Sequence, residues 1–435
     1  MKILHIAALA GLLCASVGIG LAAAQGTGAP YSSASSSGRG VKVLWWNPSK
    51  GPLELTPQDI SGPASAAFDG FILARVFGSR DNPKQGLQLA WNVFDSKVQY
   101  SLTDQNADYI GDSLAAMKAL PSSPMPDRFL RVNAAIYHSV ARGFDWTDDG
   151  YWNAVTANLR VAAQFAHDAG LRGIFLDTES YDPQPYNYAY WQTNPRYAGM
   201  SYEDVAAIVE NRGRQVIQAI NSAYPDIKII VTFGYTTMSQ HVARAQLPRT
   251  GALLAPFLDG MLVGSTPATK FIDGFEESYW HDNNPQYFSN WADVIKGRNK
   301  ALYNIRFQKY PARYAQQYQA GFALFLDRDR TVNLVDGSQR GVSGFYGWCG
   351  NSKPSGKVFY SPARLAYTVQ QAVAASDGYV WVYTQKPNAW VSGGAAGGLA
   401  PAYAQAIAAG ARAGNGIGAP IAQDTSDAPD SMTCQ

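Results

Sequence analysis

Short apolar runs that end in polar residues recur along this chain. The clearest covers residues 173–176 and stops at Asp177, with Glu179 two positions further on. A run of four to eight apolar residues without polar alternation is typical of a strand buried on both faces, and such strands occur mainly in parallel sheets flanked by helices. We therefore expect the two acids after this run to line a cleft at the carboxyl end of a strand.

The same pattern predicts eight strands, alternating with amphipathic or apolar segments of helical spacing. The predicted strands cover 41–47, 67–75, 129–138, a stretch within 170–181, 227–235, 260–265, 320–326 and 377–385, with a further possible short strand at 89–94. The predicted helices lie near 113–120, at 149–169 after Thr147 or Asp148 as N-cap, after Ser201 with Asp204 at the capping-box position, at 362–375 and at 400–413. The Pro/Tyr/Trp-rich segment at 182–191 is predicted to be a loop.

This alternation is typical of α/β folds and permits either an open doubly wound sheet or a closed barrel. The segment after the first strand, Trp45 to Pro48, lacks the glycine spacing of a dinucleotide-binding loop. Strands recur as far as residue 385, which leaves no room for a second domain. We expect one (β/α)8 TIM-type barrel at 41–392, followed by an Ala/Gly-rich segment and tail at 393–435.

The N-terminus has the pattern of an export signal. Lys2 supplies positive charge, an apolar stretch follows, and three alanines precede Gln25. Residues 1–24 are therefore a predicted signal peptide and 25–40 a flexible Gly/Ser-rich linker. The expected location is the periplasm or the extracellular space, with no membrane contact after cleavage. One alternative is that this segment is a membrane anchor. A further alternative is a lipoprotein with its lipid attached to Cys14.

Composition narrows the function classes. Of 435 residues, 46% are hydrophobic, 16% are charged and the formal net charge is +2, which indicates neither a nucleic-acid surface nor an acidic tail. Aromatic residues make up 12%, enough to suggest stacking faces for sugar rings. The five histidines are scattered and no metal-binding or serine-hydrolase motif appears, so we expect no metal and no cofactor. Cys349 and Cys434 could pair in an oxidising compartment.

In a barrel of this kind the reacting groups lie at the carboxyl ends of the strands and in the loops that follow. There we expect Glu179 and Glu276 to act as the acid and the base or nucleophile, with Asp177 tuning Glu179; the pattern leaves open which glutamate has which role. The predicted substrate-binding residues are the other polar and aromatic groups at these ends: Trp46, Arg75, His138, Tyr181, Tyr235, Asp273, Glu277, Asp327, Trp381, Tyr383 and Gln385. Structural alternatives stay open: the acids could bind structural arginines, and the aromatic rings could serve ordinary packing.

The Asp177-Thr178-Glu179 ending is similar to the D-x-E ending in several families of (β/α)8-barrel glycoside hydrolases, including chitinase-like ones. In those families the Glu commonly donates the proton and the Asp orients or stabilises. The two further upstream acids of the chitinase pattern are absent between Arg172 and Leu176. The segment 273–279, with the strand 379–383, resembles poorly characterised secreted bacterial proteins assigned to the glycoside hydrolases.

Two carboxyl groups, aromatic faces and hydrogen-bond donors at one barrel mouth are what glycoside hydrolysis requires. The sequence therefore predicts an exported glycoside hydrolase whose partner is a carbohydrate substrate. One alternative is a carbohydrate-binding barrel without catalysis, motivated by Gln385 where the last strand could have carried another acid. A less favoured alternative is a polysaccharide lyase.

Overall fold

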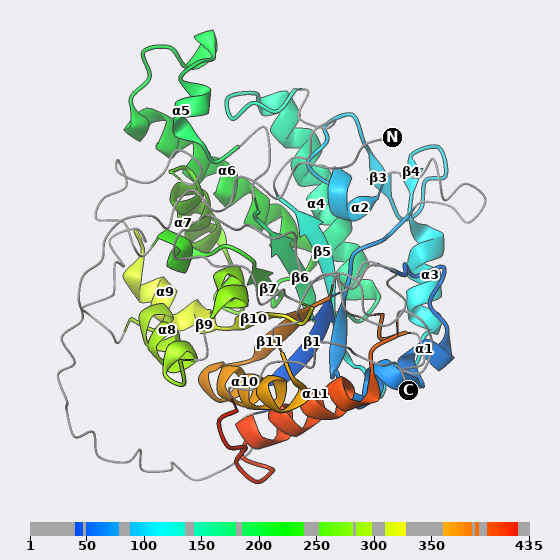
Figure 1. The fold of residues 1–435 in the computed structure, drawn as a ribbon. Helices are drawn as coiled ribbons and strands as arrows, with labels where there is room; N and C mark the ends of the chain where they lie inside the picture. Colours follow the sequence, from blue (N-terminus) through cyan, green and yellow to red (C-terminus); the bar gives the residue numbers. More distant parts are fainter. Residues whose placement is uncertain are drawn as a thin grey trace, which may run out of the picture.

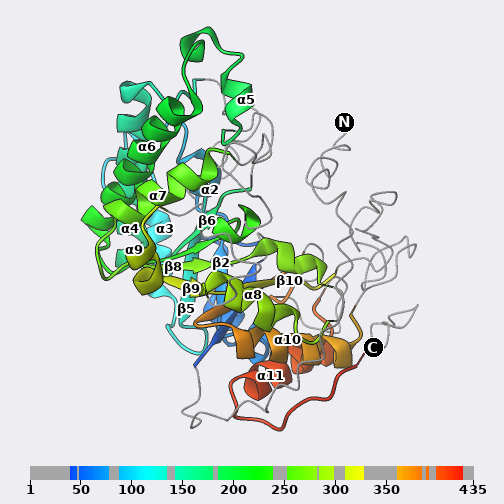
Figure 2. The same ribbon diagram turned by 90° about the vertical axis from the view of Figure 1, so that its left-hand side faces the viewer.

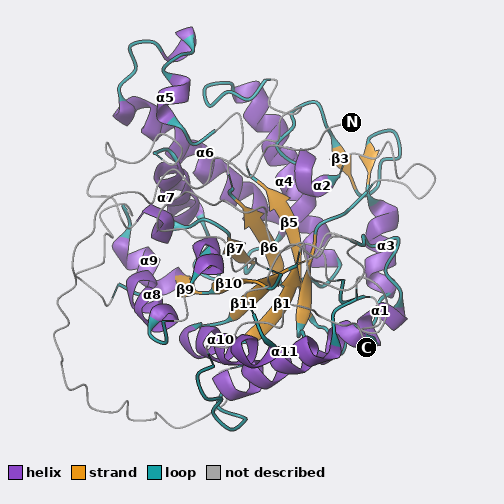
Figure 3. Ribbon diagram, in the orientation of Figure 1, coloured by secondary structure: helices purple, strands orange, loops and turns teal. Residues whose placement is uncertain are grey.

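The protein was analysed as a computed structural model, which describes residues 40–46, 49–77, 88–134, 143–179, 185–238, 252–281, 284–297, 309–327, 360–384, 388–390 and 398–424. At the centre lies a parallel β-sheet that curls into a barrel and is surrounded by helices (Figures 1 and 3). Every pairing between neighbouring strands of this sheet is parallel. In sheet order the strands are β10 (Phe322–Phe325), β11 (Tyr379–Tyr383), β1 (Lys42–Trp46), β2 (Gly70–Leu73), β5 (Asp127–Asn133), β6 (Gly173–Asp177), β7 (Lys228–Val231), β8 (Lys270–Asp273) and β9 (Tyr318–Ala320).

The barrel closes through β9 and β10, which are consecutive pieces of one strand separated by Gly321. β9 pairs with β8, and β10 pairs with β11. A Cβ atom on Gly321 would lie 2.6 Å from Ile272 Cγ2 and 2.9 Å from the Tyr379 carbonyl oxygen, so only glycine fits between the two neighbouring strands. With this junction counted as one strand, the sheet is an eight-stranded closed barrel, which confirms the predicted α/β fold of TIM type.

Alternate residues of the barrel strands form an interior cluster separate from the larger core that faces the helices. All eight strand positions contribute to it: Leu44, Trp46, Ile72, Phe129, Phe175, Ile230, Ile272, Ala323, Phe325, Tyr379 and Trp381. At the amino end of the barrel, the Tyr379 hydroxyl donates to Asp127, Lys228 donates to Tyr379 and Arg172 forms an ion pair with Asp127. Hydrogen-bonded charges therefore close one end of the barrel, and the candidate site lies at the other.

Helices cover the outer face of the sheet. The α-helices are α1 (Pro57–Ser61), α2 (Leu89–Asn92), α3 (Gly111–Ala119), α4 (Asp149–Asp168), α5 (Tyr188–Trp191), α6 (Tyr202–Ala223), α7 (Leu254–Gly264), α8 (Tyr287–Ile295), α9 (Pro311–Gln317), α10 (Pro362–Ala375) and α11 (Pro401–Gly414). The 3-10 helices are η1 (Pro63–Ala66), η2 (Pro195–Tyr197), η3 (Tyr235–Met238) and η5 (Glu276–Trp280), and a small separate sheet pairs β3 (Tyr100–Ser101) with β4 (Asp108–Tyr109). Figure 2 shows α4, α6 and α7 together on one side of the barrel, and α10 beside α11 on another.

The predicted caps are present. Asp148 accepts a hydrogen bond from the Tyr151 backbone N–H at the start of α4, and Ser201 and Asp204 form a reciprocal capping box at the start of α6. The C-terminal segment contains α11 as predicted. Asn415, directly after α11, exchanges hydrogen bonds with the backbone of Val41, which tethers the end of that helix to the start of β1.

Three element predictions were wrong. Residues 260–265 belong to α7 and not to a strand; every residue from 254 to 262 is buried, and a helix buried on all sides has no amphipathic period to reveal it. The sixth barrel strand is β8, whose buried apolar run is only Phe271 and Ile272. The possible strand at 89–94 is the short helix α2, and the segment predicted as a loop contains α5. Within the described ranges no helix is both long and apolar enough to cross a membrane.

Candidate active site

Glu276 is the first residue of η5, directly after β8 turns away from the barrel wall. The turn is made by Phe275, whose backbone adopts the left-handed region with φ 38° and ψ 67°. A side chain rarely accepts this conformation, and strained backbone of this kind is found most often at functional sites. The Glu276 backbone N–H donates to the Thr232 carbonyl oxygen at 3.0 Å, which fixes the residue above the end of β7. Its side chain is 9% exposed.

Asp177 and Glu179 follow β6 but differ in their surroundings. Asp177 is buried inside the barrel and accepts two hydrogen bonds from the guanidinium of Arg131 on β5, one of them from Nε at 3.1 Å. Its other oxygen accepts the Glu179 backbone N–H at 3.1 Å. Asp177 is thus the ion-pair partner of Arg131 and orients the Glu179 backbone. Both of its carboxylate oxygens already accept hydrogen bonds within the protein. Glu179 itself is half-buried.

Thr232, the residue after β7, connects the two acidic strand ends. Its hydroxyl oxygen accepts the Thr178 backbone N–H at 2.9 Å and lies 3.4 Å from Asp177 Oδ1, while its carbonyl oxygen accepts the Glu276 N–H. The pairing register places Val231 beside Leu176 on one side and beside Asp273 on the other. Glu179 and Glu276 therefore project from strands that flank the same strand, at a similar height above the barrel.

The environment of Glu276 favours its protonated form. Burial raises the pKa of its carboxyl well above the usual value, and the negative charges of Glu179, Asp177 and Glu277 raise it further, while Arg131 opposes them. Loss of solvation and neighbouring like charges both disfavour ionisation. The Glu276 carboxyl therefore holds its proton to a higher pH than an exposed glutamate does, within electrostatic range of Glu179.

Two buried polar atoms at this mouth have no hydrogen-bond partner among the described residues. They are the indole N–H of Trp46, whose side chain is 7% exposed, and Oε2 of Glu276. Almost all buried polar groups in proteins are hydrogen-bonded, so exceptions require an explanation. An indole N–H and a carboxyl oxygen without partners at the same end of the barrel are suited to binding a ligand hydroxyl.

Aromatic rings surround these groups and differ in their exposure. The Trp381 ring is 0% exposed, its indole N–H donates to the Gly274 carbonyl oxygen at 3.0 Å, and its ring packs against Trp46 with centroids 5.2 Å apart. Trp381 therefore lies in the packed interior of the barrel, and its role in substrate stacking stays a prediction. Tyr383 is half-buried, and its ring stacks on Tyr279 with centroids 6.0 Å apart.

Asp327 lies directly after the last strand segment of the barrel closure and is buried. The pKa of the Tyr383 hydroxyl is raised first by burial and then by the charges of Asp327 and Glu276. Asp327 and Tyr383 thus belong to the same mouth as the two glutamates. Their contact with a substrate stays a prediction.

Asp273 and Glu277 lie behind the barrel wall. Asp273 accepts the Thr236 hydroxyl at 2.8 Å and the Phe275 N–H at 3.3 Å, and burial raises its pKa to about 6. Burial likewise raises the pKa of Glu277 to about 7, and its carboxyl interacts with Thr237. Asp273 is fully enclosed by these contacts, so it supports the turn before Glu276 and does not face the mouth.

Arg75 and Tyr235, also predicted to bind substrate, form contacts within the protein. The Arg75 guanidinium donates to the Ser49 carbonyl oxygen at 2.9 Å and lies over the Phe77 ring. The Tyr235 hydroxyl donates to Asp259 on α7 at 2.7 Å, within the helix-facing core. The remaining predicted residues, His138, Tyr181 and Gln385, lie outside the described residues, as do Cys349, Cys434 and residues 1–39.

Sequence reasoning missed Arg131, Thr232 and Tyr279. Arg131 interrupts an apolar strand two positions after Phe129, so the two-residue period of a strand places it inside the barrel. Tyr279 follows Glu276 by three residues in a 3-10 helix, where such positions share one face. Its hydroxyl pKa is raised well above the usual value, first by burial and next by Glu276. Both signals were present in the sequence.

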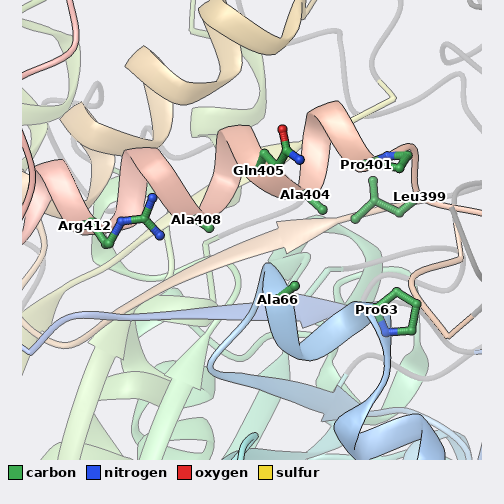
Figure 4. A pocket seen from close by; sticks show the side chains of 8 residues that line it. All are labelled: Pro63, Ala66, Leu399, Pro401, Ala404, Gln405, Ala408 and Arg412. Carbon is green, nitrogen blue, oxygen red and sulfur yellow. The ribbon is translucent and has the colours of Figure 1, made fainter.

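A depression of about 490 Å³ lies away from this mouth, between η1, which leads into the amino end of β2, and α11 (Figure 4). It is mostly apolar and includes none of the candidate site residues. Its lining consists of Pro63, Ala66, Leu399, Pro401, Ala404, Gln405, Ala408 and Arg412. In the part of the chain that the structure describes, no group of three or more His, Cys, Asp or Glu side chains could hold a metal ion.

The fold and mouth together define an eight-stranded α/β barrel with paired carboxyls at the carboxyl ends of its strands. No protein-family model matches the chain, and no curated protein matches it. Similar solved structures include a sugar phosphate isomerase/epimerase from Parabacteroides distasonis, with TM-score 0.31 and 9% identity, covering 85% of this chain and 96% of that chain. An alpha-amylase from Anoxybacillus has TM-score 0.32 and 12% identity, covering 79% of this chain and 70% of that one. Values this low carry no information about the reaction, and the fold class rests on the closed parallel barrel itself.

Proposed function

We propose that the protein is a glycoside hydrolase that cleaves a poly- or oligosaccharide at the barrel mouth. The observation that carries the proposal is the carboxyl pair: Glu276, buried and with a raised pKa, within electrostatic range of the half-buried Glu179. Glycosidic cleavage needs one carboxylic acid to protonate the leaving oxygen and one carboxylate to act as base or nucleophile. A buried carboxyl with a raised pKa is suited to the first role.

The roles follow from the surroundings of each group. Glu276 is the proton donor, because burial and three neighbouring carboxylates raise the pKa of its carboxyl. Glu179 is the base or nucleophile. Asp177 does not transfer protons in this proposal; its ion pair with Arg131 and its hydrogen bond to the Glu179 backbone position that glutamate.

The other groups of the mouth are assigned to substrate binding. The Trp46 N–H is available to donate to a sugar hydroxyl, and the half-buried Tyr383 ring can contact a sugar ring. Asp327 completes the polar lining. His138, Tyr181 and Gln385 remain proposed contacts on the basis of their sequence positions.

The test is a screen of the purified protein against glucans, arabinans, galactans and amino-sugar polymers, with product analysis. The wild type is expected to release shorter saccharides from at least one polymer. Glu179→Gln and Glu276→Gln are each expected to lower the rate by about 10²–10⁴-fold, the usual effect of losing an acid or base. Glu203→Gln, on the exposed first turn of α6, is the matched control and should retain the wild-type rate.

The screen also separates the alternatives. Full activity in both site variants would contradict the proposal. Intact glycan retained by the wild type after long incubation would favour the carbohydrate-binding alternative, and an unsaturated product absorbing in the ultraviolet would favour a lyase.

We also propose that the protein is exported, because a polysaccharide substrate would lie outside the cytoplasm. Residues 1–24 are the proposed signal peptide, on the charge and apolar pattern of the N-terminus. N-terminal sequencing of the protein recovered from a secreting host should begin at Gln25. Recovery of the intact N-terminus from the cytoplasm alone would contradict export.

A further inference from the structure

The segment between β6 and α6 carries an exposed aromatic ring that the proposed mechanism does not use. We infer that residues 185–200, which we call the α5 arm, form a further carbohydrate-binding element, in which the ring of Tyr190 binds a neutral polysaccharide chain beyond the carboxyl pair. The inference rests on the proposed function in taking a glycan as the ligand. It adds the class of glycan and the place where the bound chain continues, and binding there is measurable without hydrolysis.

The base of the α5 arm lies at the carboxyl end of the barrel. Tyr186 is buried, and its hydroxyl donates at 3.2 Å to the carbonyl oxygen of Ala134, the residue directly after β5. The Ala134 backbone N–H in turn donates at 2.7 Å to the carbonyl oxygen of Asp177, the last residue of β6. Tyr190 follows Tyr186 by four residues, a length of chain that spans at most about 14 Å. Tyr190 is therefore close enough to the strand ends for one glycan chain to contact both.

Hydrogen bonds and ring contacts hold the α5 arm in one position. The indole N–H groups of Trp146 and Trp191 both donate to the Pro185 carbonyl oxygen, at 3.0 Å and 2.7 Å. The Tyr197 hydroxyl accepts the Trp146 backbone N–H at 2.8 Å, and its ring packs against Trp191 with centroids 5.1 Å apart. A binding group on a support that is already ordered loses little conformational entropy when a ligand binds.

Tyr190 differs from the buried aromatic residues of the arm in its exposure. It is 41% exposed, whereas Tyr186, Trp191 and Tyr197 are each at most 4% exposed. The Tyr190 and Trp191 rings are nearly perpendicular, with centroids 5.1 Å apart and planes at 87°. In both views of the ribbon, α5 projects beyond α6 and away from the body of the molecule (Figures 1 and 2). The ring thus retains apolar surface that a sugar ring can cover.

The composition of the α5 arm favours a neutral glycan over other ligands. Its one charged residue is Arg196, which forms an ion pair with Asp145. Nucleic acids and anionic membrane surfaces are bound through several Lys and Arg side chains, and the arm has no second one. A protein partner would require a larger apolar patch than one ring. The exposed residues Gln192 and Thr193 instead supply amide and hydroxyl groups suited to sugar hydroxyls.

The experiment is affinity electrophoresis of the full chain in gels that contain glucans, arabinans or galactans. Glu276→Gln is the background, so that the polymer is not shortened during the run. The background protein is expected to be retarded by at least one polymer, and addition of Tyr190→Ala should weaken that binding about tenfold. Tyr190→Phe retains the ring and should keep the affinity within about threefold of the background.

The matched control is Ile417→Ala, directly after α11. Ile417 is the other large hydrophobic residue that is exposed in the described part of the chain, at 70%, so its loss tests whether any exposed apolar side chain causes retardation. Its replacement should leave the affinity unchanged. The inference is overturned if Tyr190→Ala binds as well as the background, if Ile417→Ala loses as much, or if no neutral polymer retards the protein. A dimer that becomes a monomer in Tyr190→Ala would assign the ring to an interface between copies, and would also overturn it.

Kinetics of hydrolysis separate this inference from the proposed function. With both glutamates intact, Tyr190→Ala should raise KM for the polymer about tenfold and leave kcat within about twofold, because the ring contributes binding and not proton transfer. KM for short oligosaccharides should stay within about twofold. Binding that depends on Tyr190, without hydrolysis by the wild type, would contradict the proposed function and support the inference. Hydrolysis of a polymer with an unchanged KM in Tyr190→Ala would support the function and contradict the inference.

Discussion

Among single residues, Glu276 has the most unfavourable position for a negative charge. Its carboxyl is removed from water, and the acids around it come from its own helix and from β6. Each neighbouring charge that is removed should make ionisation of Glu276 easier. The pH range of the proposed hydrolysis should therefore depend on acids other than the two proposed catalytic glutamates.

Glu277→Gln tests this dependence without removing a proposed catalytic group. Glu277 has a pKa of about 7, so above that pH it is ionised and hinders ionisation of Glu276. In Glu277→Gln the alkaline limb of the kcat–pH profile should move to lower pH, with activity at pH 5–6 largely retained. Glu203→Gln should leave the limb in place, and an unmoved limb in Glu277→Gln would count against Glu276 as the proton donor.

Asp273 gives a second pH dependence, in stability. Its folded-state pKa of about 6 lies above the usual value of 3.8, so the folded protein binds the proton more tightly than the unfolded chain does. This contribution to stability is complete below pH 4 and is lost as the pH rises through 6, by up to about 3 kcal/mol.

Asp273→Asn removes that titration. Urea unfolding at pH 4, 5, 6 and 7 should show a shallower loss of unfolding free energy between pH 4 and 6 in the variant than in the wild type. Asp226→Asn, on the exposed turn before β7, is the control and should keep the wild-type slope. An equal slope in Asp273→Asn and wild type would show that Asp273 does not titrate in this range.

At the level of elements, Thr232 after β7 bonds to the segments that follow its two neighbouring strands, β6 and β8. Thr232→Val keeps the shape of the side chain and leaves the Thr178 N–H without its acceptor, at a cost of about 1–3 kcal/mol in unfolding free energy. Because Thr178 adjoins Glu179, kcat should fall at least tenfold with a smaller change in KM. Thr156→Val on α4, whose hydroxyl bonds only within its own helix, is the control for the loss of a hydroxyl.

The sequence was informative where an element has a clear period or an abrupt end. The run before Asp177 and the caps at Asp148 and Ser201 identified β6, α4 and α6. The sequence was misleading at 260–265, because the periodicity of a short apolar run does not distinguish a buried helix from a buried strand. Glu276 nevertheless follows the end of a strand, as expected, because the true strand, β8, ends only three residues before it.

The site could be predicted as a set of acids but not as a set of contacts. The linear sequence does not show that Asp177 forms an ion pair with Arg131. It also does not show that the Trp381 ring is buried, with its indole N–H bonded to the Gly274 carbonyl oxygen. Both facts depend on which strands become neighbours and on the register between them. Pairings of this kind are tertiary, so residue type at a strand end indicates a location and not a role.

For the whole molecule, closure of the barrel depends on Gly321. Gly321→Ala places a Cβ atom within 2.6 Å of Ile272 Cγ2 and should lower the unfolding free energy by about 1–3 kcal/mol through overpacking. Gly378→Ala is the matched control next to β11, since its new Cβ would meet only Gln319 Oε1, at 3.6 Å. Thermal unfolding should show a lower Tm for the first variant alone.

The pairing of β1 with β11 also has a consequence for synthesis. Lys42 lies beside Tyr379 in the register, and Val41 is tied to Asn415 beyond the last helix. During synthesis β1 thus has one edge without its partner until the residues of β11 (Tyr379–Tyr383) have been made. Long-range contacts of this kind slow folding and expose unpaired strand edges to other chains. A nascent chain of this protein should therefore need protection by a chaperone until its last strand has emerged.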